Sequence, residues 1–195
     1  MSAFILTIFI FLGGLFLFKM LYVFATAGAL PRTQGAVFTS TAPIKIDAFL
    51  DAVPMNDKEL LIDLGCGDGR VLRAAQRRYG VAAVGFEINA LAYCMARILS
   101  FGTTGIRIKC RNFWSENFRQ ADVVFCYLFP DVMKRLATKL EAELRPGARV
   151  VSCNFSIPGW SPLEVLRPNS SCHGDPIYVY CLPDSCSSMH HGSKT

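Results

Sequence analysis

The pattern of apolar and polar residues divides the chain into a short, almost uncharged beginning and a longer mixed remainder. Residues 3–18 carry no charge, Lys19 interrupts the run, and residues 20–30 are again uncharged. About 20 apolar residues suffice to carry a helix through the hydrocarbon core of a bilayer. We therefore predict one spanning helix over residues 3–24, with the Lys19 amine extending toward the interface.

A cleaved secretory signal is the competing interpretation of this segment. Small residues around Ala25 and Ala27 suit a cleavage site, but the positively charged stretch that normally precedes the apolar run is missing. Residues 1–18 carry no Lys or Arg, whereas Lys19, Arg32 and Lys45 come after them. This asymmetry predicts a single-pass membrane anchor with the following domain in the cytoplasm.

The rest of the chain alternates between short apolar runs and segments with helical spacing. Helices are expected at 44–53, 70–79, 90–101 and 131–144, and strands at 60–64, 82–88, 106–111, 121–128 and 148–155. Helices between successive strands require crossover connections and a mostly parallel sheet covered on both faces. Residues 163–182 hold two extended stretches without an intervening helix, so they are expected to add an antiparallel hairpin. The prediction is an α/β fold with a seven-stranded sheet.

Composition marks the limits of this domain. Pro31 to Pro43 is rich in Gly, Pro, Thr and Ser, which is typical of a linker. The segment after Pro183 is dominated by Ser, His, Gly and Lys and is expected to be disordered. The predicted organisation is an anchor at 1–30, a linker at 31–43, one domain at 44–183 and a tail at 184–195.

The length, net charge and cysteine spacing of the chain limit the kinds of function that it can have. The 195 residues, 52% of them hydrophobic, suffice for one catalytic domain and an appendage. The net charge is +5, but Lys and Arg do not form the dense clusters of a nucleic-acid surface, so such a substrate is disfavoured. Eight scattered cysteines favour reduced thiols over a disulfide framework. No metal is expected, because the candidate ligands lack a tight paired spacing; they are Cys172, His173, Cys181, Cys186, His190 and His191.

The strongest chemical signal is the turn after the first strand of the domain. It reads Asp63-Leu64-Gly65-Cys66-Gly67-Asp68-Gly69, with glycines at alternate positions that let the backbone approach a ligand closely. It is not the dinucleotide fingerprint, in which the third glycine would stand where Arg70 stands. Glu87 follows about 20 residues later at a strand end, where a carboxylate can accept from both hydroxyls of a ribose. The pair predicts a nucleoside site; the alternative is an ordinary tight turn and a solvated glutamate.

Two further strand ends border the same edge of the predicted sheet. Asn112 and Phe113 follow the third strand. Asn112 could hydrogen-bond to the amino group of an adenine while Phe113 packs on its ring. The alternative is a turn asparagine beside core aromatics. Tyr127 and Pro130 follow the fourth strand, where Tyr127 could form a wall near the reacting group. Asp131 is a second candidate there, with a helix N-cap as the alternative.

These motifs together resemble the class I S-adenosylmethionine-dependent methyltransferases. The resemblance rests on the segment 63–69, on Phe86-Glu87-Ile88-Asn89, on the Pro130 junction and on residues 144–151. More narrowly, Phe38 to Tyr180 is similar to the small protein-lysine methyltransferase family, which has archaeal and membrane-anchored mitochondrial members. The resemblance implies a Rossmann-like methyltransferase fold and S-adenosyl-L-methionine as cofactor.

The resemblance also implies roles for individual residues. Tyr127 and Pro130 would form the substrate-side wall, and Tyr127, Phe129 and Trp160 would line an apolar channel for an acceptor lysine of a protein. Cofactor contacts are implied for Asp63, Gly65, Cys66, Gly67, Asp68, Gly69, Glu87, Asn89, Asn112 and Phe113. The alternatives are a lipid or other small hydrophobic acceptor, or a cofactor-binding membrane protein without turnover. A nicotinamide-dependent oxidoreductase is disfavoured by the glycine spacing.

Overall fold

The computed structural model describes residues 2–33, 40–168 and 174–183. Its helices are α1 (Ser2–Thr33), α2 (Pro43–Ala52), α3 (Arg70–Tyr79), α4 (Ala90–Leu99) and α5 (Pro130–Glu143), with a 3-10 turn η1 (Phe113–Ser115). Its strands are β1 (Leu60–Leu64), β2 (Ala82–Glu87), β3 (Ile106–Cys110), β4 (Val123–Cys126), β5 (Arg149–Cys153), β6 (Glu164–Leu166) and β7 (Ile177–Cys181). The elements predicted between residues 44 and 155 are all present, and each end lies within two residues of its expected position.

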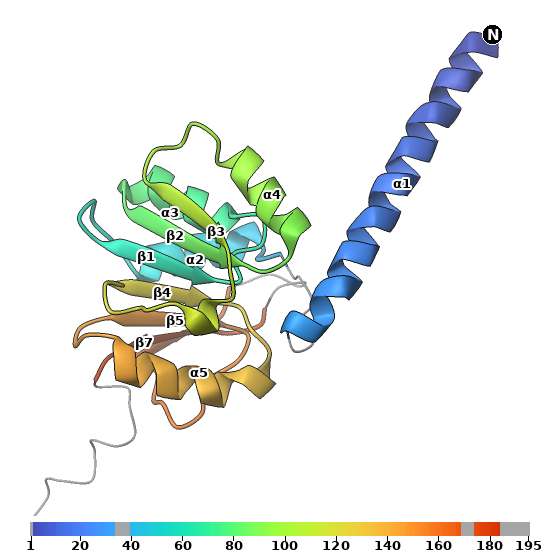
Figure 1. The fold of residues 1–195 in the computed structure, drawn as a ribbon. Helices are drawn as coiled ribbons and strands as arrows, with labels where there is room; N and C mark the ends of the chain where they lie inside the picture. Colours follow the sequence, from blue (N-terminus) through green and yellow to red (C-terminus); the bar gives the residue numbers. More distant parts are fainter. Residues whose placement is uncertain (1, 34–39, 169–173, 184–195) are drawn as a thin grey trace, which may run out of the picture.

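The strands form one seven-stranded sheet in the order β3-β2-β1-β4-β5-β7-β6 (Figure 1). The five strands from β1 to β5 run parallel to one another, while β7 runs antiparallel to both β5 and β6. The predicted fold class is therefore confirmed, including the hairpin at the C-terminal end. The strand order reverses between β1 and β4, so the crevice at the carboxyl ends of these two strands is where an open α/β sheet binds its ligand.

Two apolar cores cover the two faces of the sheet. On one face α2, α3 and α4 pack against the strands, with Phe49, Leu72 and Ala96 among their buried residues. On the other face α5 packs through Met133 and Leu136. Successive residues of a strand alternate between these cores, which is why the central strands are apolar on both sides and read as continuous apolar runs.

Prolines, a glycine and an asparagine set the ends of several helices. Pro43 and Pro130 each occupy the first turn of a helix, where the missing N–H has no intrahelical partner in any case. Gly80 ends α3 in the left-handed conformation, with a φ of 69°. The Asn89 side chain accepts from the first N–H groups of α4 and fixes its start.

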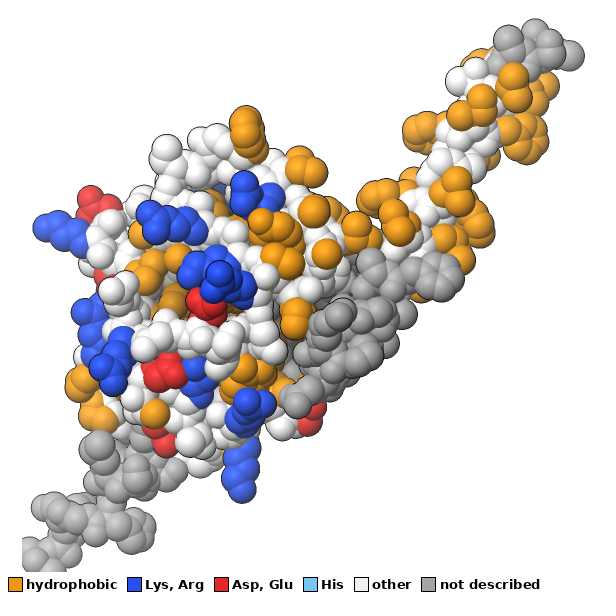
Figure 2. All heavy atoms as spheres, viewed as in Figure 1, with side chains coloured by type: hydrophobic (Ala, Val, Ile, Leu, Met, Phe, Trp, Pro, Cys, Tyr) orange, Lys and Arg blue, Asp and Glu red, His pale blue; other side chains and the backbone are white. Residues whose placement is uncertain are grey.

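Helix α1 is longer than the anchor predicted from composition. It continues to Thr33, so the first residues of the expected linker are helical, and it stops two residues after Pro31. Residues 4–21 form a segment long and apolar enough to cross a membrane, with a mean hydropathy of 2.4 and exposed side chains (Figure 2). By length and composition alone, a signal sequence would pass the same test.

Some sequence expectations lie outside the described residues. They concern linker residues 34–39, the tail 184–195, and five of the disfavoured metal ligands, namely Cys172, His173, Cys186, His190 and His191. Pro43 and the residues just before it are described, and the Thr41 side chain is buried there. Thr41, two residues before α2, is therefore packed against the rest of the structure.

Gly85 in the middle of β2 shows how closely the sheet approaches the glycine-rich turn. A Cβ placed on Gly85 would lie 2.6 Å from both Cys66 Sγ and Leu72 Cδ1. We expect Gly85→Ala to lower the free energy of unfolding by about 1–3 kcal/mol, the range for overpacking a tight core. Thermal unfolding of the full chain in detergent would measure it.

The matched control is Ala82→Ser at the exposed start of the same strand. A surface change of this kind should alter the free energy of unfolding by roughly 0.5 kcal/mol at most. Equal melting temperatures for Gly85→Ala and the control would contradict the tight contact.

Candidate functional site

The glycine-rich turn joins β1 to α3 at the carboxyl edge of the sheet. Gly65, Gly67 and Gly69 have φ values of 78°, 55° and 75°, which residues with a Cβ rarely adopt. The amides of Gly65 and Cys66 both donate to the Phe86 carbonyl, at 2.9 and 3.0 Å, so the turn is fastened to β2. The sequence thus produces a rigid stretch of bare backbone that faces the crevice.

The Glu87 carboxylate is held by backbone amides from two segments. Its Oε2 accepts from Gly67 N at 2.9 Å and its Oε1 accepts from Asn89 N at 2.7 Å. Glu87 is only 8% exposed, and two backbone donors fix the plane of its carboxylate. Because an ionised carboxylate has about four acceptor positions, lone pairs remain on both oxygens for two adjacent hydroxyls of a ligand.

Asp63 in β1 lies beside this turn and is almost completely buried. Burial raises the pKa of Asp63 well above its usual range, and the charges of Glu87 and Asp68 raise that pKa further. The arrangement therefore disfavours a third anion and favours a cation in front of the turn. A ligand that carries positive charge would relieve the repulsion among these carboxylates.

Asp68 differs from Asp63 because it has a basic partner. Although burial acts in the opposite direction, hydrogen bonds and charge from Arg70 lower the pKa of Asp68. Arg70 Nη2 lies 2.7 Å from Asp68 Oδ2, and Arg70 Nη1 also reaches the Thr41 carbonyl at 3.3 Å. The ion pair thus ties the turn to the segment that precedes α2.

A small cavity of about 20 Å³ joins several of these groups. It extends from the glycine-rich turn to Tyr127 at the end of β4 and to Ser40 and Thr41 before α2. The predicted site residues that line it are Asp63, Gly65, Cys66, Gly67, Asp68 and Tyr127. Glu87 and Asn89 connect to the same turn through their hydrogen bonds, whereas Gly69 packs behind it against Ala96 and Ile108.

The structure gives Asn89, Asn112 and Phe113 local structural partners. Asn89 Oδ1 accepts from the amides of Leu91 and Ala92 at the start of α4. Asn112 Oδ1 accepts from Trp114 N at 3.1 Å, so the oxygen expected to contact a ligand also begins η1. Phe113 is half-buried, with its ring centroid 4.8 Å from that of Trp114. Contacts from these three side chains to a cofactor remain predictions.

A polar cluster that the sequence did not reveal as a group surrounds Tyr127 at the carboxyl edge of the sheet. We call Lys45, Tyr127, Asn154 and Asp175 the Lys45 cluster. The Lys45 ammonium is buried, hydrogen-bonds to Asn154 Oδ1, forms an ion pair with Asp175 at 3.3 Å and lies 5.6 Å from the centre of the Tyr127 ring. Asn154 Nδ2 donates to the Tyr127 hydroxyl at 2.8 Å. Lys45 and Asn154 therefore hold the Tyr127 phenol directly, and Asp175 acts on it through both of them.

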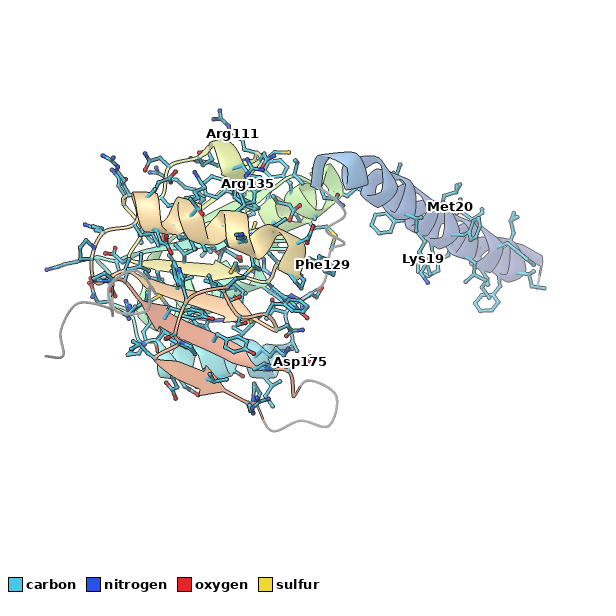
Figure 3. The ribbon with its side chains drawn as sticks, turned by 90° about the horizontal axis from the view of Figure 1, so that it is seen from below. Lys19, Met20, Arg111, Phe129, Arg135 and Asp175 are labelled. Carbon is cyan, nitrogen blue, oxygen red and sulfur yellow. The ribbon has the colours of Figure 1, made fainter. Side chains whose placement is uncertain are left out.

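Tyr127 is a neutral hydrogen-bonding group in this cluster. Burial raises the pKa of Tyr127, and the charges of Cys153 and Asp175 act in the same direction, while the bond from Asn154 opposes them. The Tyr127 oxygen accepts a hydrogen bond from Asn154 Nδ2, and this bond does not use the hydroxyl proton. The phenol can therefore still donate that proton to another group. Phe129 and Pro130 follow it, with Phe129 39% exposed on the side of the domain that faces the end of α1 (Figure 3).

The cluster could be anticipated in part. Lys45 occupies an apolar-face position of α2, since Lys45, Ile46, Phe49 and Leu50 are its buried residues. Asn154 directly follows β5 and so lies at the same sheet edge as Tyr127. Asp175 carried no such signal in the sequence. It lies before β7, and no motif or spacing relates it to Lys45, Tyr127 or Asn154.

Trp160 does not line a channel, contrary to the expectation. It is 6% exposed, its ring packs edge-on against Tyr180 at 5.5 Å, and its Nε1 donates to Glu141 of α5 at 2.6 Å. It belongs to the core on the α5 face, whereas Tyr127 packs with the core on the opposite face.

The sheet order, the turn and the carboxylate together define an S-adenosylmethionine-dependent methyltransferase. Among solved structures, an RNA methyltransferase from Salinibacter ruber in complex with S-adenosyl-L-homocysteine superposes with a TM-score of 0.69 at 28% identity. The match covers 75% of this chain and 95% of that one. A methyltransferase from Thiobacillus denitrificans, also with S-adenosyl-L-homocysteine, shares the fold with a TM-score of 0.54 at 18% identity, over 76% of this chain and 62% of that one.

The chain belongs to the ANTKMT methyltransferase domain family, whose model matches residues 63–164. A protein-lysine N-methyltransferase of Saccharolobus islandicus (strain REY15A) is 37% identical over 68% of this chain and 85% of its own length. A Homo sapiens enzyme named as a lysine N-methyltransferase of an ATP synthase subunit is 31% identical over 86% of this chain and 81% of its own length. The adenine nucleotide translocase lysine N-methyltransferase of Mus musculus is 36% identical over 62% of this chain and 52% of its own length, so this chain spans about half of it.

S-adenosylmethionine is the cofactor of this enzyme, and the residues of the site fit it. The bare turn leaves room for backbone contact, and the free lone pairs of Glu87 match the two ribose hydroxyls. The cofactor carries positive charge on its sulfonium and amino groups, which suits the surplus negative charge around Asp63. Individual contacts to the cofactor follow from this fit as predictions.

We expect Glu87→Ala to weaken the binding of S-adenosylmethionine by about 10- to 100-fold, because hydrogen bonds to a charged group contribute roughly 1.5–3 kcal/mol each. Titration calorimetry of the full chain with the cofactor and its demethylated product would measure this. The control is Glu164→Ala on exposed strand β6, far along the sheet. Unchanged affinity in a folded Glu87→Ala protein would remove Glu87 from the site.

We also expect Asp63→Asn to stabilise the cofactor-free protein at neutral pH while weakening cofactor binding. Because the folded state raises the pKa of Asp63, the wild-type protein loses stability as the pH rises above the ordinary value of about 3.9. Asparagine does not titrate, so the advantage of the variant should grow with pH toward the raised native pKa. The gain in melting temperature should reach roughly 2–4 °C for each 1 kcal/mol.

Melting curves between pH 4 and pH 8 would show this trend. Asp57→Asn is the matched control, because Asp57 is exposed before β1. A melting-temperature difference between Asp63→Asn and wild type that stays constant or shrinks as the pH rises would contradict a raised native pKa.

Proposed function

We propose that this chain is a protein-lysine N-methyltransferase that is anchored in a membrane by α1 and carries its catalytic domain, residues 44–183, on the cytoplasmic side. Three relatives named for lysine methylation support the acceptor, and two of these names specify an ATP synthase subunit and an adenine nucleotide translocase. The apolar segment of α1 and the basic residues after it support the anchor and its orientation. Cytoplasmic placement also gives the domain access to S-adenosylmethionine.

The observation that carries the acceptor assignment is the neutral, oriented hydroxyl of Tyr127 in the same cavity as Asp63. S-adenosylmethionine, when bound, supplies a methyl group that leaves its sulfonium as the lone pair of the attacking amine bonds to it. An acceptor amine must therefore arrive without its proton and with its lone pair aimed at that group. The oxygen of Tyr127, fixed by Asn154, can accept an N–H of the amine and so orient the lone pair.

The rim of the crevice suits the charged form in which a lysine approaches. Asp175 is 59% exposed and lies on the same side of the domain as Phe129 (Figure 3). Its carboxylate attracts an ammonium at the mouth, and the half-buried ring of Tyr127 disfavours the charge further in. The Lys45 ammonium adds repulsion to a cation inside, so the acceptor proton is released to solvent before transfer.

The experiment uses the purified full chain with methyl-labelled S-adenosylmethionine and membranes from cells that lack this protein. We expect the label in a membrane protein, as methyl-lysine after acid hydrolysis. Label in the lipid extract would support a lipid acceptor instead, and label in RNA would support the acceptor named for the Salinibacter ruber enzyme. Cofactor binding without any labelled product would indicate a protein that binds S-adenosylmethionine without turnover.

Tyr127→Phe tests the role of the hydroxyl within this reaction. Losing one hydrogen bond that orients the amine should lower kcat by about 3- to 10-fold, with cofactor affinity unchanged. Tyr93→Phe is the matched control, since the Tyr93 hydroxyl on α4 accepts a surface bond from Arg97, away from the crevice. Equal kcat for both variants would exclude Tyr127 from the acceptor site.

A further inference from the structure

Helix α4 is apolar on both its inner and its outer face. Its inner face is made of small residues, and Ala92 and Ala96 pack on the sheet. Its outer stripe is Met95, Ile98 and Leu99, which are 39%, 73% and 50% exposed. A helix that is apolar all round ordinarily has a covering on every side.

The turn after α4 extends this apolar surface. Phe101 is 91% exposed, and it is followed by Gly102 in a left-handed conformation. We call Met95, Ile98, Leu99 and Phe101 the α4 tip. Figure 2 shows hydrophobic side chains gathered over α4 and continuing toward α1, with Lys and Arg side chains beside them.

The charges around the α4 tip have one sign. Residues 90–111 contain four basic residues, Arg97, Arg107, Lys109 and Arg111, and no acidic one. From the neighbouring helix α3, the Arg73 guanidinium approaches the Ser100 hydroxyl at 3.5 Å. Lys109 and Arg111 share Glu116 outside this segment, which leaves a surplus of positive charge. An apolar tip with a basic rim is the composition of protein surfaces that lie on anionic bilayers.

The position of α1 identifies the bilayer as the occupant. Helix α1 contacts α4, and Figure 1 shows α1 rising beside the domain on the side of α4. Thr33 and Ser40 lie seven positions apart along the chain, a stretch that spans at most about 25 Å when extended. A domain tethered this closely to a spanning helix stays within reach of the surface of the same membrane.

We propose that the α4 tip is a second membrane contact, which inserts Ile98, Leu99 and Phe101 into the interface of an anionic bilayer while the basic residues of α4 and β3 meet the lipid phosphates. This inference rests on the proposed anchor but not on the lysine acceptor. It orients the domain with edge strand β3 toward the membrane and β6 away from it. The crevice at the strand ends, which faces the end of α1, then opens alongside the bilayer surface, where an acceptor in a membrane protein would be found.

The test places a tryptophan at the tip of the full chain. Phe101→Trp is reconstituted in nanodiscs with 30% anionic lipid, with and without brominated acyl chains, and the wild-type signal of Trp114 and Trp160 is subtracted. We expect the added fluorescence to fall at least two-fold in brominated discs, because bromine quenches only on contact. Nanodiscs without anionic lipid should show weaker quenching.

The matched control is Ala142→Trp at an exposed position of α5, which packs on the opposite face of the sheet. Its fluorescence should not respond to bromine. Equal quenching at positions 101 and 142 in chains that co-purify with the discs would overturn the proposal. A chain that fails to co-purify would refute the anchor itself, and shielding of the introduced tryptophan that depends on protein concentration in detergent would indicate a second copy instead of lipid.

Discussion

The two hydrogen bonds that hold the Glu87 carboxylate connect the parts of the site. Gly67 N lies in the turn after β1 and Asn89 N precedes α4, so one carboxylate links two strand ends and the start of a helix. The same turn is fastened to β2 through the Phe86 carbonyl and is pressed against Gly85. Any change in the spacing of β1 and β2 would therefore move the carboxylate and the bare backbone together, which keeps the cofactor site a single rigid unit.

Charge is distributed unevenly across the two sides of the crevice. On the cofactor side, Asp63 is buried near Glu87 and Asp68, and the repulsion among them suits a cationic cofactor. On the other side, the Lys45 cluster balances a buried ammonium with Asp175 and uses Asn154 to orient a neutral phenol. One side of the crevice is therefore rich in acidic groups, whereas on the other side a balanced ion pair accompanies a neutral phenol.

The three apolar features of the surface have different explanations. The segment of α1 is long enough to span a membrane, Phe129 is exposed two residues after Tyr127, and the α4 tip has no protein covering among the described residues. Helix α1 and the hydrophobic side chains over α4 lie toward one side of the domain in Figures 1 and 2, and Figure 3 shows Phe129 on the side that faces the end of α1. This one-sidedness is consistent with an enzyme that works at a bilayer surface, because apolar groups scattered at random would cover all faces equally.

The sequence by itself determined the order of helices and strands, the glycine-rich turn and Glu87, because each depends on local pattern: apolar runs, prolines that begin helices, and a spacing of about 20 residues. It also predicted the antiparallel hairpin, since no helix separates its strands. The tertiary structure decided what depends on side chains from distant segments. Asp175 joins Lys45 and Asn154 across three elements, Trp160 turns into the α5 core instead of the crevice, and Asn112 uses its oxygen in a turn. Local pattern specifies which face of an element is buried, but only the packed sheet determines which buried or edge residues meet.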